Sequence, residues 1–332
     1  MTAIDVHAHF VPPRALEALS ARGVELGISL VDKGAGARCC RFDDGLEVRP
    51  FLPGLLDLDG RLAEMDGQRV ARQILSVWTD IFGYGLDAGR CDTWHRILND
   101  GIAELCAARP ERFSWMASAP LNDAAAAARE LERCAANGAV GVIVTANVDG
   151  RNLGEVSLEE FWSACEALDM PVFVHPSLPQ PPPRAEKFSL NQTCAYTMDT
   201  TLAVSSMILG GTLDRFPRLR LLLAHGGGNL LYLIGRFDRM HDAADRNATG
   251  DRAAHPPSAY VRRFLYDSIV HSRDALRFLR EMAGIDRILL GGDAPFPPGD
   301  PDPLGSLEKA GLDDDAIERI AVTNPMREYR LD

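Results

Sequence analysis

Short runs of apolar residues, rich in β-branched side chains, recur along the chain and alternate with amphipathic helical stretches. A continuous apolar run is typical of a parallel strand that is buried on both faces, whereas a half-exposed strand alternates. Eight such runs are predicted to be strands: Ala3–Phe10, Gln73–Trp78, Phe113–Ala119, Val140–Ala146, Pro171–His175, Leu219–Ala224, Phe264–Asp267 and Arg287–Gly291. Eight strands separated by helices predict an α/β fold of the (β/α)8 barrel type, the TIM barrel.

Two of the predicted helices are clear in the pattern. The first is Leu158–Leu168, where Ser157 and Glu160 have the spacing of a capping box. The second is Asp199–Leu209, which the chain enters through Asp-Thr-Thr. Both helices fall between predicted strands, as the barrel requires.

Two regions depart from the bare barrel pattern. Residues 18–57 mix Gly, Pro and charged residues with short apolar runs, and Asp-Gly within residues 42–46 is typical of a hairpin turn. We interpret this region as a small β insertion after strand 1, beside the barrel mouth. Residues 241–258 are polar and are predicted to form a long loop. We expect residues 1–332 to form a single barrel domain.

The charge balance limits the partners. The chain carries 35 Lys and Arg residues against 47 Asp and Glu residues, a formal net charge of -12. No basic surplus is available to neutralise phosphates, so we expect neither nucleic acid nor an anionic membrane as a partner. An anionic substrate stays possible, because one or two local arginines can bind a carboxylate.

The cysteine pattern and the lack of an evident targeting or membrane segment predict a cytoplasmic protein. The seven cysteines show no CxxC spacing and are expected to be reduced. The first residues show no basic segment followed by an apolar run, so we expect no signal peptide. The longest apolar stretches are too short to cross a bilayer.

Histidines gather where predicted strands end. His7 and His9 alternate on one strand and so point to the same side, and His175 and His225 each end a further strand. Asp293 ends the last one. Active sites of (β/α)8 barrels are built at the carboxyl ends of their strands. Three imidazoles and one carboxylate would suit Zn²⁺ or a similar ion, with water in the open position.

The other four histidines fit the metal pattern less well. His95 falls in a predicted helix, His241 and His255 in the polar loop, and His271 just after the seventh strand. We expect surface or packing roles for these four.

With these motifs the chain resembles the amidohydrolase superfamily, in the branch that contains 2-amino-3-carboxymuconate 6-semialdehyde decarboxylase. The matching segments are DVHAHFVPP, VFVHPS, SMILGGTLDRFPRLRLLLAHGGG, FLYDS and ILLGGDAPFPPG. The resemblance implies that His7, His9, His175 and Asp293 bind the metal. It implies that His225 stays off the metal and handles the activated water or a substrate proton, so that His225 and Asp293 are the catalytic residues.

The resemblance also suggests substrate-binding residues. Arg49 in the insertion matches an arginine that binds substrate, and Phe296 matches an aromatic residue of the site. Gln192 stands where the decarboxylase has a tryptophan. A second arginine of the family comes from the neighbouring subunit, and Arg246 or Arg239 could correspond to it. This implies a homodimer.

Two other positions separate this chain from its relatives. Ala294 replaces a tyrosine after the metal-binding aspartate, which puts the carboxymuconate substrate in doubt. Thr145 stands where two-metal members often carry a carboxylated lysine, which is consistent with a single ion. We therefore expect one divalent metal ion, with Zn²⁺ as the leading candidate and Mn²⁺ or another ion as the alternative.

Together these features favour a metal-dependent, non-oxidative decarboxylase of a small unsaturated or aromatic carboxylic acid, with His225 as the acid/base. The same ligands would serve a hydratase or hydrolase that adds activated water to an unsaturated diacid, a lactone or an amide. A non-catalytic metal-binding or scaffold protein is a third interpretation. Inactive relatives usually lose His225 or Asp293, and both are present here.

Overall fold

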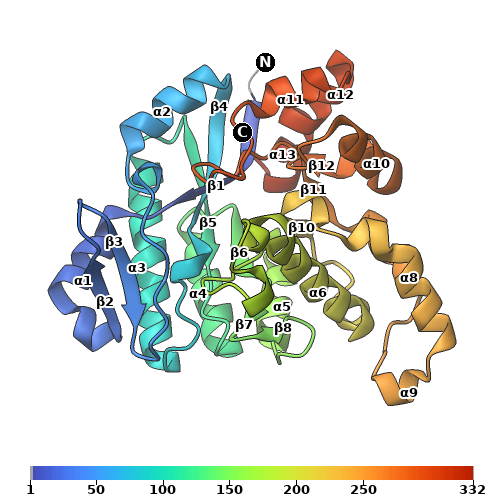
Figure 1. Cartoon of the computed structure of the whole chain (residues 1–332), viewed down its shortest axis with the longest axis horizontal. Coiled ribbons are helices and arrows are strands. Elements are labelled where there is room, and N and C mark those ends of the chain that lie inside the picture. Colours follow the sequence, from blue (N-terminus) through green and yellow to red (C-terminus); the bar gives the residue numbers. More distant parts are fainter. Residues whose placement is uncertain (1–2, 332) are drawn as a thin grey trace.

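The computed structural model describes residues 3–331 and shows a parallel barrel (Figure 1). Within these residues the strands follow the order β1-β4-β5-β6-β9-β10-β11-β12. Their bounds are β1 Ala3–Phe10, β4 Val70–Val77, β5 Phe113–Ser118, β6 Gly141–Thr145, β9 Val172–His175, β10 Leu221–Leu223, β11 Leu265–Asp267 and β12 Ile288–Leu289. The predicted (β/α)8 fold is confirmed, and each predicted strand is present with ends shifted by a few residues.

Backbone hydrogen bonds close the barrel between its first and last strands. The amide of Val6 donates to the carbonyl of Leu290 at 2.9 Å. Further along, the amide of Asp293 donates to His7 at 2.7 Å, and the amide of His9 donates to Ala294 at 2.8 Å. The first and last parts of the chain therefore meet side by side.

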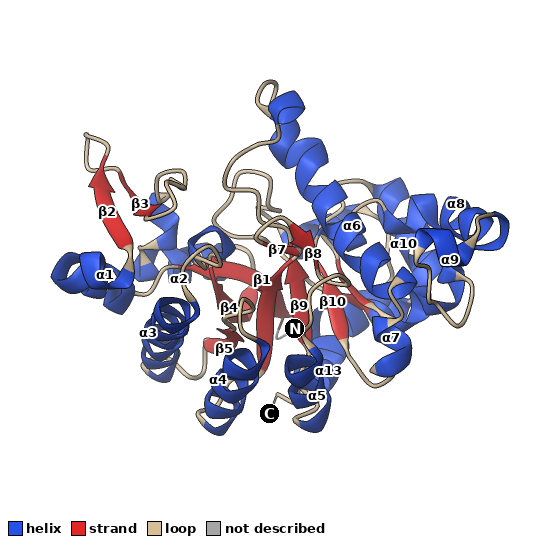
Figure 2. Ribbon diagram, turned by 90° about the horizontal axis from the view of Figure 1, so that it is seen from below, coloured by secondary structure: helices blue, strands red, loops and turns tan. Residues whose placement is uncertain are grey.

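Helices surround the strands, as Figure 2 shows from another side. Their bounds are α1 Pro13–Leu26, α2 Leu58–Gly67, α3 Ala88–Ala107, α4 Ala124–Ala136, α5 Glu159–Ala167, α6 Tyr196–Leu209, α7 Thr212–Arg215, α8 Leu230–Ala243, α9 Arg246–Thr249, α10 Arg273–Ala283, α11 Pro303–Lys309, α12 Asp314–Glu318 and α13 Asn324–Tyr329. Their apolar faces cover a sheet made largely of Val, Ile and Leu, so the strands are buried on both sides.

The two helix starts predicted from the sequence are shifted, by one residue for α5 and by three for α6. The first helix, α5, begins at Glu159 with the fully buried Leu158 at its N-cap, so packing rather than the predicted Ser157 capping box defines its start. The second, α6, begins at Tyr196, three residues before Asp199. The carboxylate of Asp199 does not cap the helix but accepts hydrogen bonds from Asn147 and the amide of Ser177.

The insertion after β1 contains a β hairpin, as predicted, but also a helix that the pattern did not reveal. Its first part is α1, and β2 Ile28–Asp32 then pairs with β3 Arg38–Phe42 in antiparallel fashion. The turn predicted within residues 42–46 is present but lies after β3 and not between β2 and β3. The amide of Phe42 donates to Leu46 at 2.8 Å, Gly45 has a φ of 89°, and Arg41 and Glu47 form an isolated antiparallel bridge. The hairpin lies at the edge of the molecule beside α1 (Figure 2).

The predicted long loop at residues 241–258 was wrong in part, because α8 extends into it and α9 lies within it. His241 is buried at the end of α8, where its Nδ1 atom lies 2.7 Å from a carboxylate oxygen of Asp251. His95 has the packing role expected of it: it is fully buried in α3, stacks on Tyr84 and hydrogen-bonds to Ser118.

Residues 3–331 also bear on the expectations about membrane-spanning segments and about the cysteines. No helix in this part of the chain is both long and apolar enough to cross a bilayer. The cysteines are all free, and Cys194 alone is exposed among them.

One buried arginine ties the barrel opening together. Arg61 of α2 is 2% exposed and donates hydrogen bonds to the carbonyls of His9, Gly54 and Ala294 at 3.0, 3.1 and 3.3 Å. It also reaches the side chain of Gln73 at 3.3 Å. Arg61 thus holds the end of β1 against the loop that follows β12.

Replacing Arg61 should destabilise the fold. We expect Arg61→Leu to lower the free energy of unfolding by about 3 kcal/mol, because several buried carbonyls lose their donor. Urea unfolding followed by tryptophan fluorescence measures this loss. Arg69→Leu is the matched control, because Arg69 forms an exposed pair with Glu308 and should cost much less. Equal losses in the two variants would contradict the role of Arg61.

Candidate metal centre and active site

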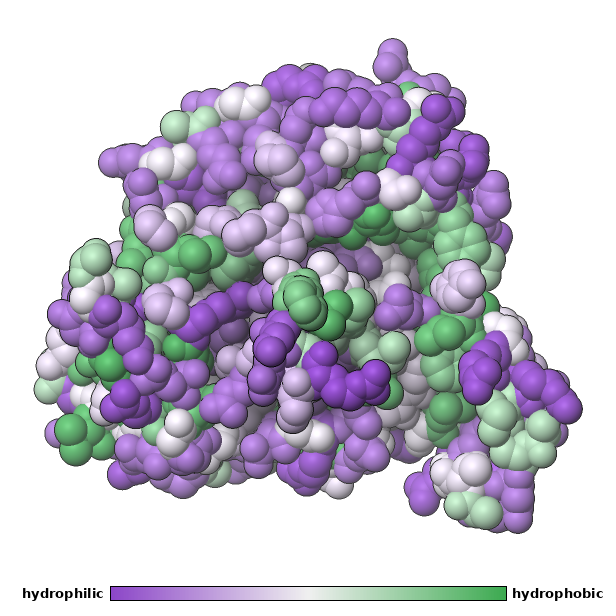
Figure 3. All heavy atoms as spheres, in the orientation of Figure 1, coloured by the Kyte–Doolittle hydropathy of each residue, from purple (hydrophilic) through white to green (hydrophobic). Residues whose placement is uncertain are grey.

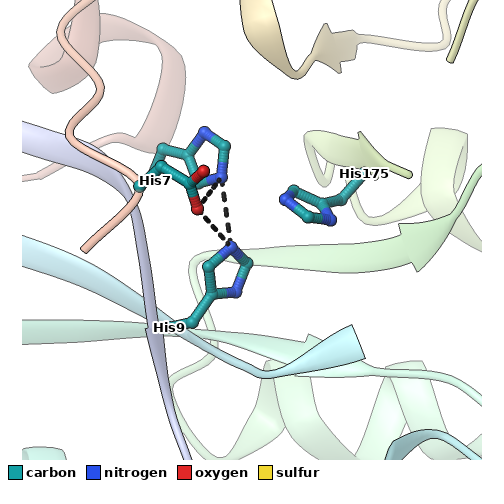
Figure 4. Close-up of side chains that lie close together, drawn as sticks. His7, His9 and His175 are labelled. Carbon is teal, nitrogen blue, oxygen red and sulfur yellow. Dashed lines mark hydrogen bonds and ion pairs between the residues drawn. The ribbon is translucent and has the colours of Figure 1, made fainter. Parts of the chain in front are cut away.

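Four side chains converge at the carboxyl end of the barrel. His7 and His9 come from β1, His175 is the last residue of β9, and Asp293 follows β12. One ligand atom from each lies within 4.8 Å of those of the others, and all four residues are buried. Figure 4 shows the three histidine rings turned toward one region. The structure therefore brings together the set of residues that the sequence singled out.

Each imidazole has its Nδ1 atom engaged, so Nε2 is left to face the centre. Nδ1 of His7 lies 2.7 Å from Oδ2 of Asp267, and Nδ1 of His9 lies 3.1 Å from the hydroxyl of Ser76. Nδ1 of His175 donates to the carbonyl of Pro176 at 2.7 Å. Such outer contacts fix ring orientation and tautomer in metal sites.

The inward-facing atoms fit a bound cation. Nε2 of His175 is buried and has no hydrogen-bond partner among the described residues, and Oδ1 of Asp293 lies 3.3 and 3.4 Å from Nε2 of His7 and of His9. Leaving such an atom unpaired costs free energy, and a bound ion would remove this cost by pairing with it. Nitrogen and carboxylate ligands of this kind suit Zn²⁺ and similar divalent ions.

The electrostatics of the cluster also favour a cation. Burial alone would raise the pKa of Asp293, but His7, His225 and His9 hold it well below its ordinary range. Burial would lower the pKa of His7, yet Asp293 and Asp267 raise it to about 10. Burial lowers the pKa of His9 to about 4. Two buried carboxylates thus make the centre attractive to positive charge.

Two carboxylates that the sequence analysis missed support the cluster. Asp267, at the end of β11, accepts from Nδ1 of His7 and from the amides of His225 and Gly226, both at 2.8 Å. Asp5 accepts from the amides of His7 and Gly292, both at 2.9 Å. In each case the acidic residue stands in an otherwise apolar strand. This position could have indicated a supporting role, because a buried charge needs several partners.

His225 faces the centre without joining the four ligands. It follows β10 in a left-handed conformation, with a φ of 56°, and its Nε2 lies 3.3 Å from Oδ2 of Asp293. Its Nδ1 atom has no partner within residues 3–331. The turn continues through Gly228, where a Cβ atom would collide with the carbonyl of Thr197. His225 is therefore held at the centre with one nitrogen free.

A cavity of about 620 Å³ opens onto this centre. His175, His225 and Asp293 form part of its wall, and apolar groups such as Trp78 and Ile269 form another part. A volume of this size is typical of sites for small molecules.

The structure brings most of the predicted substrate residues to this cavity. Arg49, Phe296 and Gln192 line it. The guanidinium of Arg49 lies 5.2 Å from the ring of Phe296 and 5.3 Å from that of Trp78, within the range of cation–π contact. His271, expected only on the surface or in packing, is exposed but also lines the cavity.

The remaining predicted residues lie elsewhere. Arg246 is in α9, where it donates to the carbonyl of Ala253 and pairs with Asp251 at 3.7 Å. It does not line this cavity in its own chain, and Arg239 lies exposed on α8. The role of either arginine in a neighbouring subunit stays a prediction.

Three further lining residues escaped the sequence analysis. Thr79 and Asp80 directly follow β4, and Tyr196 begins α6. The position of Thr79 and Asp80 at the carboxyl end of a strand was a usable signal. The signal for Tyr196 was absent, because its place depends on how α6 packs against the insertion.

Comparison with known proteins agrees with this geometry. The model of the Amidohydrolase family matches residues 4–331. The 2-amino-3-carboxymuconate-6-semialdehyde decarboxylase of Dictyostelium discoideum is 32% identical over 90% of this chain and 82% of its own length. The gamma-resorcylate decarboxylase of Rhizobium sp. is 31% identical over 74% of this chain and 82% of its own length.

A solved structure extends the agreement to the fold. The 5-carboxyvanillate decarboxylase of Sphingomonas paucimobilis superposes with a TM-score of 0.82 at 26% identity, covering 99% of both chains. The chain belongs to the amidohydrolase family, in the branch of 2-amino-3-carboxymuconate-6-semialdehyde decarboxylase-like proteins.

Proposed function

We propose that the chain, as a single barrel domain, is a metal-dependent, non-oxidative decarboxylase of an unsaturated or aromatic carboxylic acid. The observation that carries the proposal is the convergence of three imidazoles and Asp293 on the wall of a cavity that also holds His225 and Arg49. The activities named for the relatives support it, since all three are decarboxylases.

In this proposal His7, His9, His175 and Asp293 bind one divalent ion. Three nitrogens and one carboxylate suit Zn²⁺ best, and Mn²⁺ is the alternative. When bound, such an ion supplies Lewis acidity: it polarises a substrate oxygen and stabilises negative charge that develops as the C–CO₂ bond breaks. The ordered Nδ1 contacts of the histidines preorganise the ligands for it.

Protein groups hold and orient the acid. Arg49 provides a planar guanidinium, which can bind a carboxylate through two parallel hydrogen bonds. The rings of Trp78 and Phe296 offer faces for a flat, unsaturated substrate. Gln192 provides a side-chain amide at the same cavity. The apolar part of the wall limits water, which strengthens each polar contact.

His225 moves the proton. When the C–CO₂ bond breaks, its electron pair stays on the substrate carbon and CO₂ leaves. That carbon then needs a proton, and an imidazole can deliver one near neutral pH. His225 fits because it faces the cavity and its position is fixed by the backbone contact with Asp267.

We also propose a homodimer. Apolar side chains stand exposed on α6 and α8, namely Met198, Leu202, Tyr232 and Met240. Tyr232 is 85% exposed, and Figure 3 shows apolar groups along the side of the molecule where α8 lies. Exposed apolar groups that gather on one face mark protein interfaces. The exposed Arg239 lies on the same helix and could then approach the neighbouring subunit.

Release of CO₂ tests the proposed reaction. We expect the metal-loaded protein to release CO₂ from at least one acid in a panel of hydroxybenzoates, including gamma-resorcylate, and muconate-like acids, without oxidant or nucleotide. Mass spectrometry of the products measures it. Addition of water to the same substrates, with no CO₂, would instead support a hydratase or hydrolase.

Metal content should separate ligands from the proposed acid/base. The wild type should hold about one divalent ion per chain by elemental analysis, which also identifies the metal. His7→Ala and Asp293→Ala should lose it. His225→Asn should keep it while kcat falls by about 10²–10⁴-fold. Metal loss in His225→Asn would make His225 a ligand, and full metal in the other variants would refute the site.

Steady-state kinetics should show how Arg49 acts. Arg49→Lys and Arg49→Ala should both impair turnover with the metal retained, because lysine cannot reproduce the two-pronged contact. A fall in kcat as well as kcat/KM would indicate that Arg49 orients the scissile carboxylate. A rise in KM alone would indicate a remote anchor. Wild-type kinetics in Arg49→Ala would exclude Arg49 from the site.

Light scattering tests the dimer. We expect a mass near twice that of one chain at micromolar concentration. Leu202→Glu should shift the protein toward monomer, because it places a charge on the exposed face of α6. Met326→Glu is a control on an exposed apolar residue of α13. A wild-type monomer would contradict the dimer and the role of a neighbouring arginine.

A further inference from the structure

The guanidinium in the cavity is already paired with an acid. Nη2 of Arg49 lies 3.3 Å from Oδ2 of Asp80 and donates to the hydroxyl of Tyr196 at 3.0 Å. The side chain of Asp80 is 1% exposed, whereas that of Arg49 is 35% exposed. Both residues belong to the cavity wall, but the arginine is the accessible partner and the carboxylate is buried against it.

Asp80 is held firmly in this place. It lies in the short turn Thr79–Ile81 that follows β4, and its Oδ1 accepts from the hydroxyl of Ser177 at 3.0 Å. Ser177 is fixed in turn, because its amide donates to Asp199 at 3.1 Å. Burial raises the pKa of Asp80, while Arg49 and Ser177 act in the opposite direction.

This pairing changes what the cavity offers an anion. Among the described lining residues, Arg49 is the only lysine or arginine. An unpaired guanidinium beside apolar walls would attract a carboxylate strongly, because little water screens its charge. With Asp80 a few ångströms behind it, the same group presents the weaker field of an ion pair, and an approaching anion also meets the repulsion of Asp80.

We propose that Asp80 is a specificity-determining residue that makes the cavity favour acids with a single carboxylate over diacids. The inference rests on the proposed function, in the arrangement where the scissile carboxylate lies at the proposed metal centre and Arg49 is the remote anchor. A second carboxylate on the same substrate would have to bind at Arg49, whose charge Asp80 compensates. A neutral hydroxyl or carbonyl oxygen can still accept a hydrogen bond from Arg49.

The substrates named for the relatives differ in this respect. Gamma-resorcylate carries one carboxylate, whereas 5-carboxyvanillate and 2-amino-3-carboxymuconate-6-semialdehyde each carry two. By this inference the substrate of this chain resembles gamma-resorcylate in carrying a single carboxylate.

Binding of two inert acids to metal-loaded protein tests this selectivity without turnover. Benzoate carries one carboxylate, and isophthalate carries a second one on the same ring. Isothermal titration calorimetry gives the dissociation constant of each. The wild type should bind benzoate at least as tightly as isophthalate. Asp80→Asn keeps the oxygen that accepts from Ser177 but removes the charge, so its preference should shift toward isophthalate by about tenfold.

The double variant separates a direct effect of Asp80 from loosening of the fold. In Arg49→Ala the further change Asp80→Asn should leave the isophthalate-to-benzoate ratio unchanged, because no guanidinium remains to be compensated. Asp92→Asn is the matched control, since that carboxylate pairs with Arg96 on α3, outside the cavity. Its ratio should equal that of the wild type.

A wild type that prefers isophthalate, or an Asp80→Asn ratio equal to that of the wild type, would overturn the inference and leave the decarboxylase proposal standing. Binding of neither acid by the wild type would overturn the inference, whereas the proposed function is decided separately by the release of CO₂. If Asp80→Asn does not fold, Asp80→Ser replaces it, and the preference of the wild type still decides.

Discussion

The hydrogen bonds that close the barrel are the constraint on which the site depends. The amide of Asp293 donates to the carbonyl of His7, and the amide of His9 donates to that of Ala294. The contacts that join the two ends of the sheet therefore also set Asp293 beside His7 and His9, the carboxylate and two of the histidines of the proposed metal centre. Asp5 reinforces the same contact between β1 and the segment after β12 by accepting hydrogen bonds from the amides of His7 and Gly292. A change that broke these hydrogen bonds would therefore also disturb the geometry of the proposed metal centre.

The sequence predicted the parts of this architecture that local pattern determines. The apolar strands and the polar residues at their carboxyl ends were sufficient to place His7, His175 and Asp293 at one end of a barrel. Strand ends shifted because tertiary hydrogen bonds, not propensity, define them. The start of α6 was missed for the same reason: the carboxylate of Asp199 serves neighbouring loops, although its position suggested a helix cap.

The sequence did not reveal the carboxylates that contact the proposed metal-binding histidines and Arg49. Asp267, Asp5 and Asp80 are isolated acidic residues, and each has at least one partner far away along the chain, so no spacing rule identifies their contacts. Each is buried, and each has several donors or a cation to offset the loss of water. The resemblance placed Arg49 in the cavity, but the charge behind it became visible only when β4, α6 and the insertion were packed together.

The two strands that close the barrel, β1 and β12, lie far apart in the sequence, and this affects how the protein is made and folded. Asp5 and Gly292, which are joined by a hydrogen bond, are 287 residues apart in sequence. His7 and His9 leave the ribosome well before Asp293 is made, so the proposed set of four ligands cannot be complete before that residue is synthesised. The pairing of β1 with β12 likewise forms only after all of the intervening chain has been made, and such long-range pairing slows folding.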